Sequence, residues 1–169
     1  MLSWYAVYVN VKHEKKVVQK LQDQNLQAYS PLVKKLQQWS DRKKWVEFPM
    51  LSGYVFVYIL EEDKEKVLQC PGVFSFIKFN GVEAKVRASE IEILKSIELS
   101  GYDVTQEAGN LKLHSTVEIT QGHLKGLKGT VVEFKNMHYV QIQLESLHQN
   151  ITIKLPPQIL KQIPNSINR

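Results

Sequence analysis

The chain has 169 residues, of which 43% are hydrophobic and 23% charged, and its formal net charge is +5. These proportions are typical of a globular protein, and the length accommodates one domain or two small ones. No apolar run approaches the roughly 18–20 residues that cross a bilayer, and the amino terminus lacks a signal-peptide pattern. The single Cys70 cannot form an internal disulfide. We therefore expect a cytoplasmic protein without membrane contact.

The first half of the chain predicts interleaved strands and helices. Residues 4–11 favour a strand, and residues 14–25 repeat apolar side chains at helical spacing. Residues 27–32 predict a short extended piece, and the polar, basic residues 34–47 predict a long hairpin loop. The segment 53–59 is apolar on both faces, which indicates a central strand covered on both sides or covered on one side by a partner.

A second group of elements follows. Residues 62–70 predict a helix that ends at Pro71-Gly72, and residues 73–79 predict a strand. Asn80-Gly81 is a tight-turn signal before residues 82–86. Ser89 and Glu92 have capping-box spacing, which predicts the start of another helix. Residues 100–114 contain two glycines and no clear period, which indicates a linker.

The remainder of the chain has a different pattern. Short β-type runs occupy residues 116–120, 130–134, 138–144 and 151–155, separated by turns. Four or five such strands can bury a core only by curling into a small barrel. We therefore predict an N-terminal α/β (α+β) domain over residues 1–99, in which helices flank an antiparallel sheet, then a linker over 100–114. An all-β barrel over 115–163 follows.

The basic residues are concentrated near the amino terminus. Residues 10–45 carry nine basic and three acidic side chains, a local charge of +6. One localised basic face is what a protein needs to contact a phosphate backbone, although a solvated helix and loop would have the same composition.

Catalytic and metal-binding patterns are missing from the sequence. The histidines show no metal-ligand spacing, and no nucleophile elbow is present. The glycine-rich stretch 117–131, VEITQGHLKGLKGTV, does not have the order of a phosphate-binding loop, and it leads into a β-type run. We expect no enzymatic activity, no cofactor and no metal.

Both halves resemble the NusG-type transcription elongation factors. The stretch 117–131 resembles the KOW motif of that family at Val117, Ile119, Gly122, Gly126, Gly129 and Val131. This implies a five-stranded SH3-like barrel, although His123-Leu124 stands where the family often has Pro-Phe, and the usual Gly-Arg at the end is absent. SWYAVYV, KWVEFPMLSGYVFV and GVFSFIKFNG resemble the NusG N-terminal domain in order and spacing. The spacing and the 34–47 loop resemble the specialised RfaH/UpxY-like paralogues more than housekeeping NusG.

The resemblance implies partners and sites. Family members bind the clamp helices of the RNA polymerase β′ subunit through an apolar depression, and the matching positions here, with their neighbours, are Tyr8, Pro49, Leu51, Tyr54 and Phe56. In RfaH-like proteins the first helix faces the non-template DNA strand in the transcription bubble. The corresponding candidates are Lys12, His13, Lys15, Lys16 and Lys20, with a second basic group at Arg42, Lys43 and Lys44.

The implied function is that of a monomeric antitermination or elongation factor. It would suppress pausing and termination in specific operons, while the barrel recruits a ribosome or a termination factor. An RfaH-like helical alternative for the barrel segment stays open, as does pause enhancement in place of antitermination. The alternative from another class is a KOW-type RNA- or ribosome-binding protein without a polymerase role.

Overall fold

The computed structural model describes residues 1–105, 112–134 and 137–164. The chain divides into two compact units, Met1–Glu92 and Ile93–Arg169, and the division falls inside helix α3 (Ala88–Ser100). The two units are described separately below.

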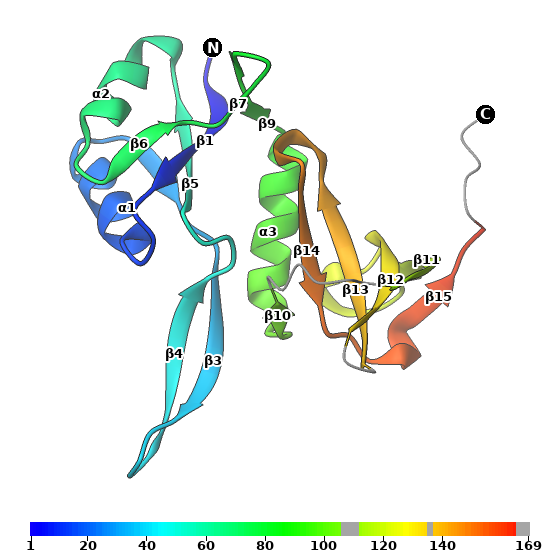
Figure 1. Ribbon diagram of the computed structural model, residues 1–169. Coiled ribbons are helices and arrows are strands. Elements are labelled where there is room, and N and C mark those ends of the chain that lie inside the picture. Colours follow the sequence, from blue (N-terminus) through cyan, green and yellow to red (C-terminus); the bar gives the residue numbers. More distant parts are fainter. Residues whose placement is uncertain (106–111, 135–136, 165–169) are drawn as a thin grey trace. The chain divides into compact units, whose positions relative to one another are not determined.

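Unit 1 is built on an antiparallel sheet with the strand order β2-β5-β1-β6, in which β9 also pairs with β1 (Figure 1). Its strands are β1 (Ser3–Val9), β2 (Gln27–Tyr29), β5 (Tyr54–Ile59), β6 (Val73–Phe76) and β9 (Lys85–Val86). The predicted strands at 4–11 and 53–59 are confirmed as the paired central strands of this sheet. The predicted strand 73–79 is divided between β6 and a short β7 (Lys78–Phe79).

One face of this sheet forms the core of unit 1. The helices are α1 (Glu14–Asp23) and α2 (Lys64–Gln69), with a single 3₁₀ turn, η1 (Glu61–Asp63), before α2. Val17 and Leu21, four residues apart on α1, are buried with the alternate strand residues Val7, Val55 and Val57 in one hydrophobic cluster. The apolar residues of α1, at helical spacing, and those of the strands, at every second position, therefore pack together on one side of the sheet.

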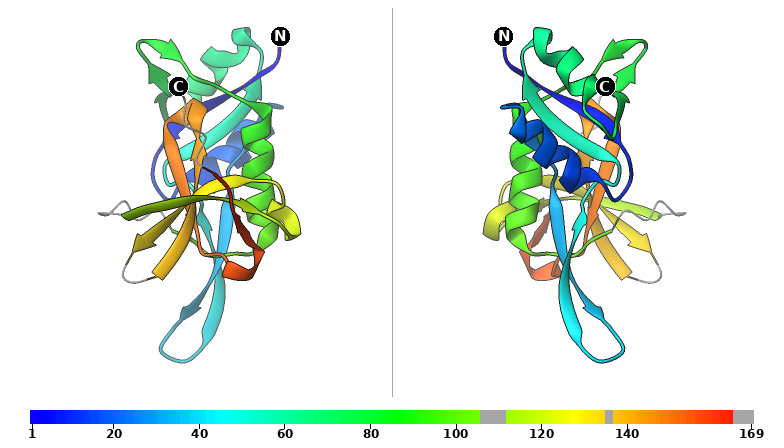
Figure 2. Two further views of the ribbon diagram at one scale, coloured as in Figure 1. Left: turned by 90° about the vertical axis from the view of Figure 1, so that its right-hand side faces the viewer. Right: turned by 90° about the vertical axis from the view of Figure 1, so that its left-hand side faces the viewer.

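The segment predicted as a long loop is a β-hairpin. Strands β3 (Leu32–Gln38) and β4 (Lys43–Pro49) pair antiparallel along their whole length, and the turn is closed by a 2.7 Å hydrogen bond from Trp39 N to Arg42 O. The hairpin extends away from the rest of unit 1 in every view (Figures 1 and 2). The hairpin predicted at 34–47 is therefore present, but most of it is paired strand and not loop. Polar composition does not prevent strand pairing when neither strand contains an internal glycine or proline.

Two other local predictions have different outcomes. The Asn80-Gly81 turn is confirmed, since both residues have positive φ (51° and 78°) between β7 and β8 (Val82–Glu83), as a type I′ turn requires. The capping box was misplaced. Helix α3 begins at Ala88, so Ser89 lies inside it, and the carboxylate of Glu90 accepts a hydrogen bond from Arg87 N at 3.2 Å.

Unit 2 is dominated by one antiparallel sheet with the order β10-β14-β13-β12-β11-β15. Its strands are β10 (Val104–Thr105), β11 (Lys112–Ile119), β12 (Lys128–Phe134), β13 (Met137–Leu144), β14 (Gln149–Ile153) and β15 (Leu160–Gln162). The predicted runs all lie in or beside these strands. The linker prediction fails for Val104–Thr105, which pair with β14, and for residues 112–114, which begin β11, while residues 106–111 lie outside the described residues.

Alternate strand residues bury the core of unit 2. Val117, Val132, Val140, Ile142 and Ile151 are each at most 4% exposed. The exposed residues between them are mostly polar, as the two-residue period of a strand with one buried face requires.

The three glycines of the 117–131 stretch have two different structural roles. Gly122 and Gly126 adopt positive φ (78° and 89°) around a 3₁₀ turn, η2 (Gly122–Leu124), and Gly126 N donates to Ile119 O at 2.7 Å. Gly129 lies within β12, where a Cβ atom would stand 2.7 Å from the carbonyl oxygen of Gln141 and 2.6 Å from Val140 Cγ1. Gly122 and Gly126 thus serve the turn, whereas Gly129 is required by the close approach of β13.

We therefore predict that Gly129→Ala destabilises unit 2 by about 1–3 kcal/mol, because the added methyl overlaps a backbone carbonyl that cannot rotate away. Urea denaturation followed by circular dichroism measures the effect. Lys128→Ala at the neighbouring exposed position is the control and should change stability by less than about 0.5 kcal/mol. Equal stability of Gly129→Ala and the control would contradict the predicted close approach.

Candidate functional site

Aromatic side chains line the sheet face of unit 1 opposite the valine-rich cluster. Tyr8 and Tyr54 are direct partners across β1 and β5, and their rings meet edge to face at 5.2 Å. Tyr8 is 42% exposed, whereas Tyr54 is half-buried. Burial, followed by a hydrogen bond with Tyr8, raises the pKa of Tyr54 well above its usual range, so this phenol stays neutral and can donate a hydrogen bond.

The other three residues predicted to contact polymerase differ in exposure. Pro49, the last residue of β4, is half-buried, Leu51 is 5% exposed, and Phe56 is fully buried with its ring 6.4 Å from that of Tyr29. Tyr8, Tyr54 and Pro49 thus offer accessible surface, and we call them the tyrosine patch. Contact with polymerase stays a prediction for all five residues. For Leu51 and Phe56 the structure places the side chain in the interior.

A buried carboxylate fixes the loop between β4 and β5. Glu14, the first residue of α1, is 2% exposed, and its Oε1 accepts a hydrogen bond from Gly53 N at 2.8 Å. Gly53 has a φ of +79°, and its carbonyl accepts from Val9 N at 2.9 Å. The loop is therefore fastened both to the start of α1 and to the end of β1, immediately before Tyr54.

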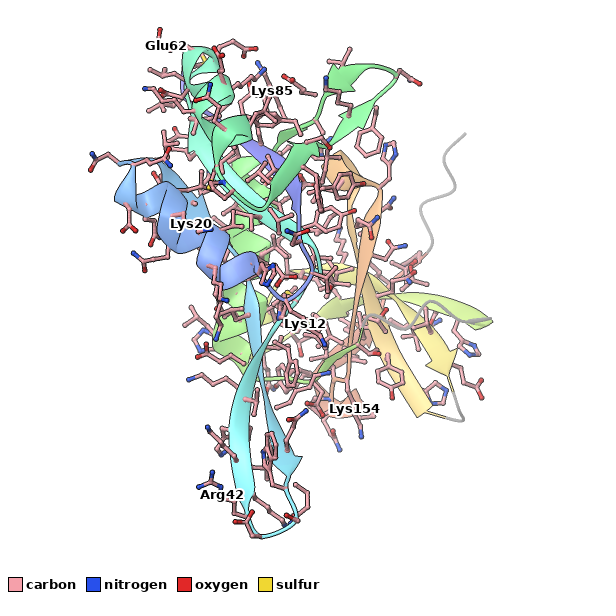
Figure 3. All side chains as sticks on the ribbon, turned by 60° about the vertical axis from the view of Figure 1, so that its left-hand side comes forward. Lys12, Lys20, Arg42, Glu62, Lys85 and Lys154 are labelled. Atoms are coloured by element: carbon pink, nitrogen blue, oxygen red, sulfur yellow. The ribbon has the colours of Figure 1, made fainter. Side chains whose placement is uncertain are left out.

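The predicted nucleic-acid residues of the first helix are all on the surface. Lys12, His13, Lys15, Lys16 and Lys20 are exposed, and Figure 3 shows Lys12 and Lys20 among the side chains of α1 and the turn before it. Lys15 Nζ lies 2.7 Å from Glu47 Oε2 on β4, which ties the helix to the hairpin and lowers the pKa of Glu47 through that hydrogen bond. Among the described residues, no carboxylate lies within ion-pair distance of Lys12, Lys16 or Lys20.

The second predicted basic group does not form a single face. Lys43 and Lys44 pair with Gln38 and Gln37 across the hairpin, so their side chains point to opposite sides of the ribbon. Arg42 lies at the far end of the hairpin (Figure 3). The three cations are exposed, and their contact with nucleic acid stays a prediction.

Sequence reasoning missed part of the hairpin surface. Leu36 and Trp45 are direct cross-strand partners, 49% and 66% exposed, and they form an exposed apolar pair on the same hairpin as the basic residues. Glu47 was also missed as the partner of Lys15. Alternation of side-chain character along 32–38 and 43–49 could have indicated the two strands. The Leu36–Trp45 contact also depends on the register between those strands, which cannot be read from the sequence.

A group of potential metal ligands also appears in unit 2. His114 on β11, Glu133 on β12 and His138 on β13 have side-chain ligand atoms within 4.8 Å of one another. Their separations in the sequence do not match a local metal-ligand motif. It is the only such group of three or more among the described residues. Cys70 is buried, and burial raises the pKa of its thiol, which disfavours the thiolate needed for nucleophilic chemistry.

The comparisons with known proteins decide the family. The sequence model of the NusG family, described as transcription termination factor nusG, matches residues 2–95, more than half of the chain. This chain belongs to the NusG family. A search of curated proteins found no matching relative. No helix among the described residues is long and apolar enough to span a membrane.

One solved structure shows that this fold has been seen before. The structure described as "Domain interaction in Thermotoga maritima NusG" superposes with a TM-score of 0.59 at 19% identity, covering 97% of this chain and 98% of that one. Two conformations of the MjSpt4:Spt5 complex match at 20% and 22% identity over 95% of this chain, with TM-scores of 0.33 and 0.34. Family membership identifies the chain as a transcription elongation factor of the NusG type.

The Glu14–Gly53 hydrogen bond predicts the behaviour of two substitutions in this NusG-family chain. Glu14→Ala should lower the free energy of unfolding by about 1–3 kcal/mol, because it leaves the buried Gly53 N–H without an acceptor. Glu14→Gln keeps an acceptor oxygen and should lose clearly less. Urea unfolding of both variants is the measurement, and equal losses would show that the hydrogen bond does not fix the loop.

Proposed function

We propose that the chain is an antitermination factor of the RfaH/UpxY-like kind, which binds the β′ clamp helices of RNA polymerase through the tyrosine patch and the non-template DNA strand through α1. The observation that carries the proposal is the exposed Tyr8–Tyr54 pair in a domain that the NusG family model matches. The basic helix in the same unit supports the DNA contact.

The chemistry of the patch suits a protein partner. Tyrosine is enriched among the residues that dominate binding energy at interfaces, because its ring buries apolar area while its hydroxyl keeps a hydrogen-bond partner. The edge-to-face contact with Tyr8 restrains the Tyr54 ring, so less side-chain entropy is lost on binding. The fastened 50–53 loop limits movement at the border of the patch.

The basic helix suits a phosphate backbone without sequence readout. Lys12, Lys16 and Lys20 have no carboxylate partner within the described part of the chain, so their charges are available to an anion. Lysine neutralises phosphates but does not distinguish bases. His13, exposed at the start of α1, supplies a ring that can stack on an extruded base.

Processivity follows from differential binding to two polymerase states. A factor that binds the closed clamp tenfold more tightly than the open clamp shifts that equilibrium by about 1.4 kcal/mol. A factor that contacts both the clamp helices and the non-template strand favours the closed-clamp state of polymerase, in which it can bind both at once. In this proposal the sheet-rich unit 2, as a KOW-type SH3-like barrel, recruits a ribosome or a termination factor.

We expect Tyr8→Ala combined with Tyr54→Ala to abolish most of the effect on pausing and terminator read-through, because the double variant removes both aromatic anchors. The measurement is in-vitro transcription through a pause and a terminator, on several templates because a specialised paralogue requires its own recruitment sequence. Phe74→Ala is the matched control, since Phe74 is a 66% exposed aromatic residue on β6 of the same sheet.

If the wild-type protein changes neither pausing nor read-through on any template but binds structured RNA, the KOW-type RNA-binding alternative replaces the proposal. If the double variant, shown to be folded by circular dichroism, retains full activity, the tyrosine patch is not the polymerase contact. Phe56→Ala is not used, because loss of a fully buried ring would destabilise the fold itself.

The DNA contact is tested by the salt dependence of binding. Lys16→Gln combined with Lys20→Gln should weaken binding to single-stranded DNA and reduce the slope of log affinity against log salt by about 1.4, since each lost phosphate contact contributes about 0.7. The control replaces the exposed Lys85 and Lys154 by Gln, which changes the net charge equally. Equal slopes for the two double variants would show that only the total charge matters.

A further inference from the structure

Three polar side chains from neighbouring strands of unit 2 converge on one point of the sheet surface. His114, Glu133 and His138 lie on β11, β12 and β13, which are adjacent in the sheet. Glu133 and His138 are direct partners across β12 and β13. His114 lies within a register shift between Leu113 and Thr116 of β11, opposite the same part of β12.

The distances between the ligand atoms approach those of a metal site. His114 Nε2 lies 3.3 Å from Glu133 Oε2, and the rings of His114 and His138 have centroids 5.7 Å apart. Ligands about 2.0–2.2 Å from a tetrahedral zinc ion are separated by roughly 3.3–3.5 Å. The His–Glu pair already has this separation, and the remaining ligand atoms, within 4.8 Å of one another, need to close by at most about 1.5 Å.

The surroundings allow that adjustment. The side chains of His114 and Glu133 are 41% and 28% exposed, and His138 is exposed as well, so rotation about their side-chain bonds meets no packed core. The strands beneath them hold the three backbones in fixed register. The arrangement thus combines three hydrogen-bonded strands with side chains that can move to a ligand.

We propose that His114, Glu133 and His138 form a binding site for one divalent transition-metal ion, with Zn²⁺ as the best match. Two imidazole nitrogens and one carboxylate oxygen are ligands of borderline softness that suit zinc and its neighbours and select against Mg²⁺ and Ca²⁺, which prefer all-oxygen sites. Water completes the coordination, because the site opens to solvent. The bound ion joins β11, β12 and β13 and stabilises unit 2 in its folded state.

The simpler alternative is a cross-strand contact without a metal. A His–Glu pair and a tilted contact between two imidazole rings can stabilise neighbouring strands on a sheet surface without any metal. This alternative predicts no stoichiometric metal binding and a thermal stability that is independent of zinc.

The test uses the full-length chain after removal of metal with a chelator. Isothermal titration with ZnCl₂ should give one site per chain, and Co²⁺ as the probe should give the intense visible absorption of a low-symmetry site with protein ligands. His138→Ala and Glu133→Gln should each weaken Zn²⁺ binding at least about tenfold. His123→Ala is the matched control, since His123 is an exposed histidine of the same unit outside the cluster, and it should leave binding unchanged.

Two results would overturn the proposal. One is the absence of stoichiometric Zn²⁺ binding by the wild-type chain. The other is Zn²⁺ binding that both cluster variants retain, or that His123→Ala weakens as much as they do, because the metal would then be held elsewhere. The two cluster substitutions lie on different strands, with His138 exposed and Glu133 half-buried, and circular dichroism confirms that each variant is folded before the titration.

Discussion

The antiparallel pairing of β1 with β5 is the constraint on which unit 1 depends. Its register places Tyr5, Val7 and Val9 on one face with Val55, Val57 and Ile59, and these residues are buried against α1 and α2. The same register leaves Tyr8 beside Tyr54 on the opposite face. A slip of one residue would exchange the two faces, so the register that builds the core also creates the tyrosine patch.

The elements around this strand pair position the rest of the candidate surface. The carboxylate of Glu14 connects the start of α1 to the loop before β5, and the Lys15–Glu47 ion pair connects α1 to the hairpin. The exposed ion pair contributes little to stability, about 0–1 kcal/mol, whereas the buried hydrogen bond is costly to remove. The basic helix is therefore held chiefly by its buried face and by Glu14.

How much could be predicted from the sequence differs between elements. The strand at 54–59 and the helix at 14–23 can be predicted from local periodicity, and the positive φ of Asn80 and Gly81 can be predicted from turn chemistry. The strands of the hairpin at 32–49 were predicted as a hairpin loop because residues 34–47 are mostly polar and basic. The burial of Phe56 is one of the two outcomes that the apolar pattern of residues 53–59 left open. The choice between them, like the meeting of His114 with His138, depends on which elements become neighbours in the fold.

The central claim is that the surface around Tyr8 contacts the polymerase clamp. The most direct measurement places a photo-cross-linking amino acid at position 8 of the full-length chain and maps the products formed with a transcribing polymerase. The account predicts a cross-link to the β′ clamp helices, and none from the same amino acid at position 74 on β6. Failure of position 8 to cross-link to those helices, or equal cross-linking from both positions, would contradict it.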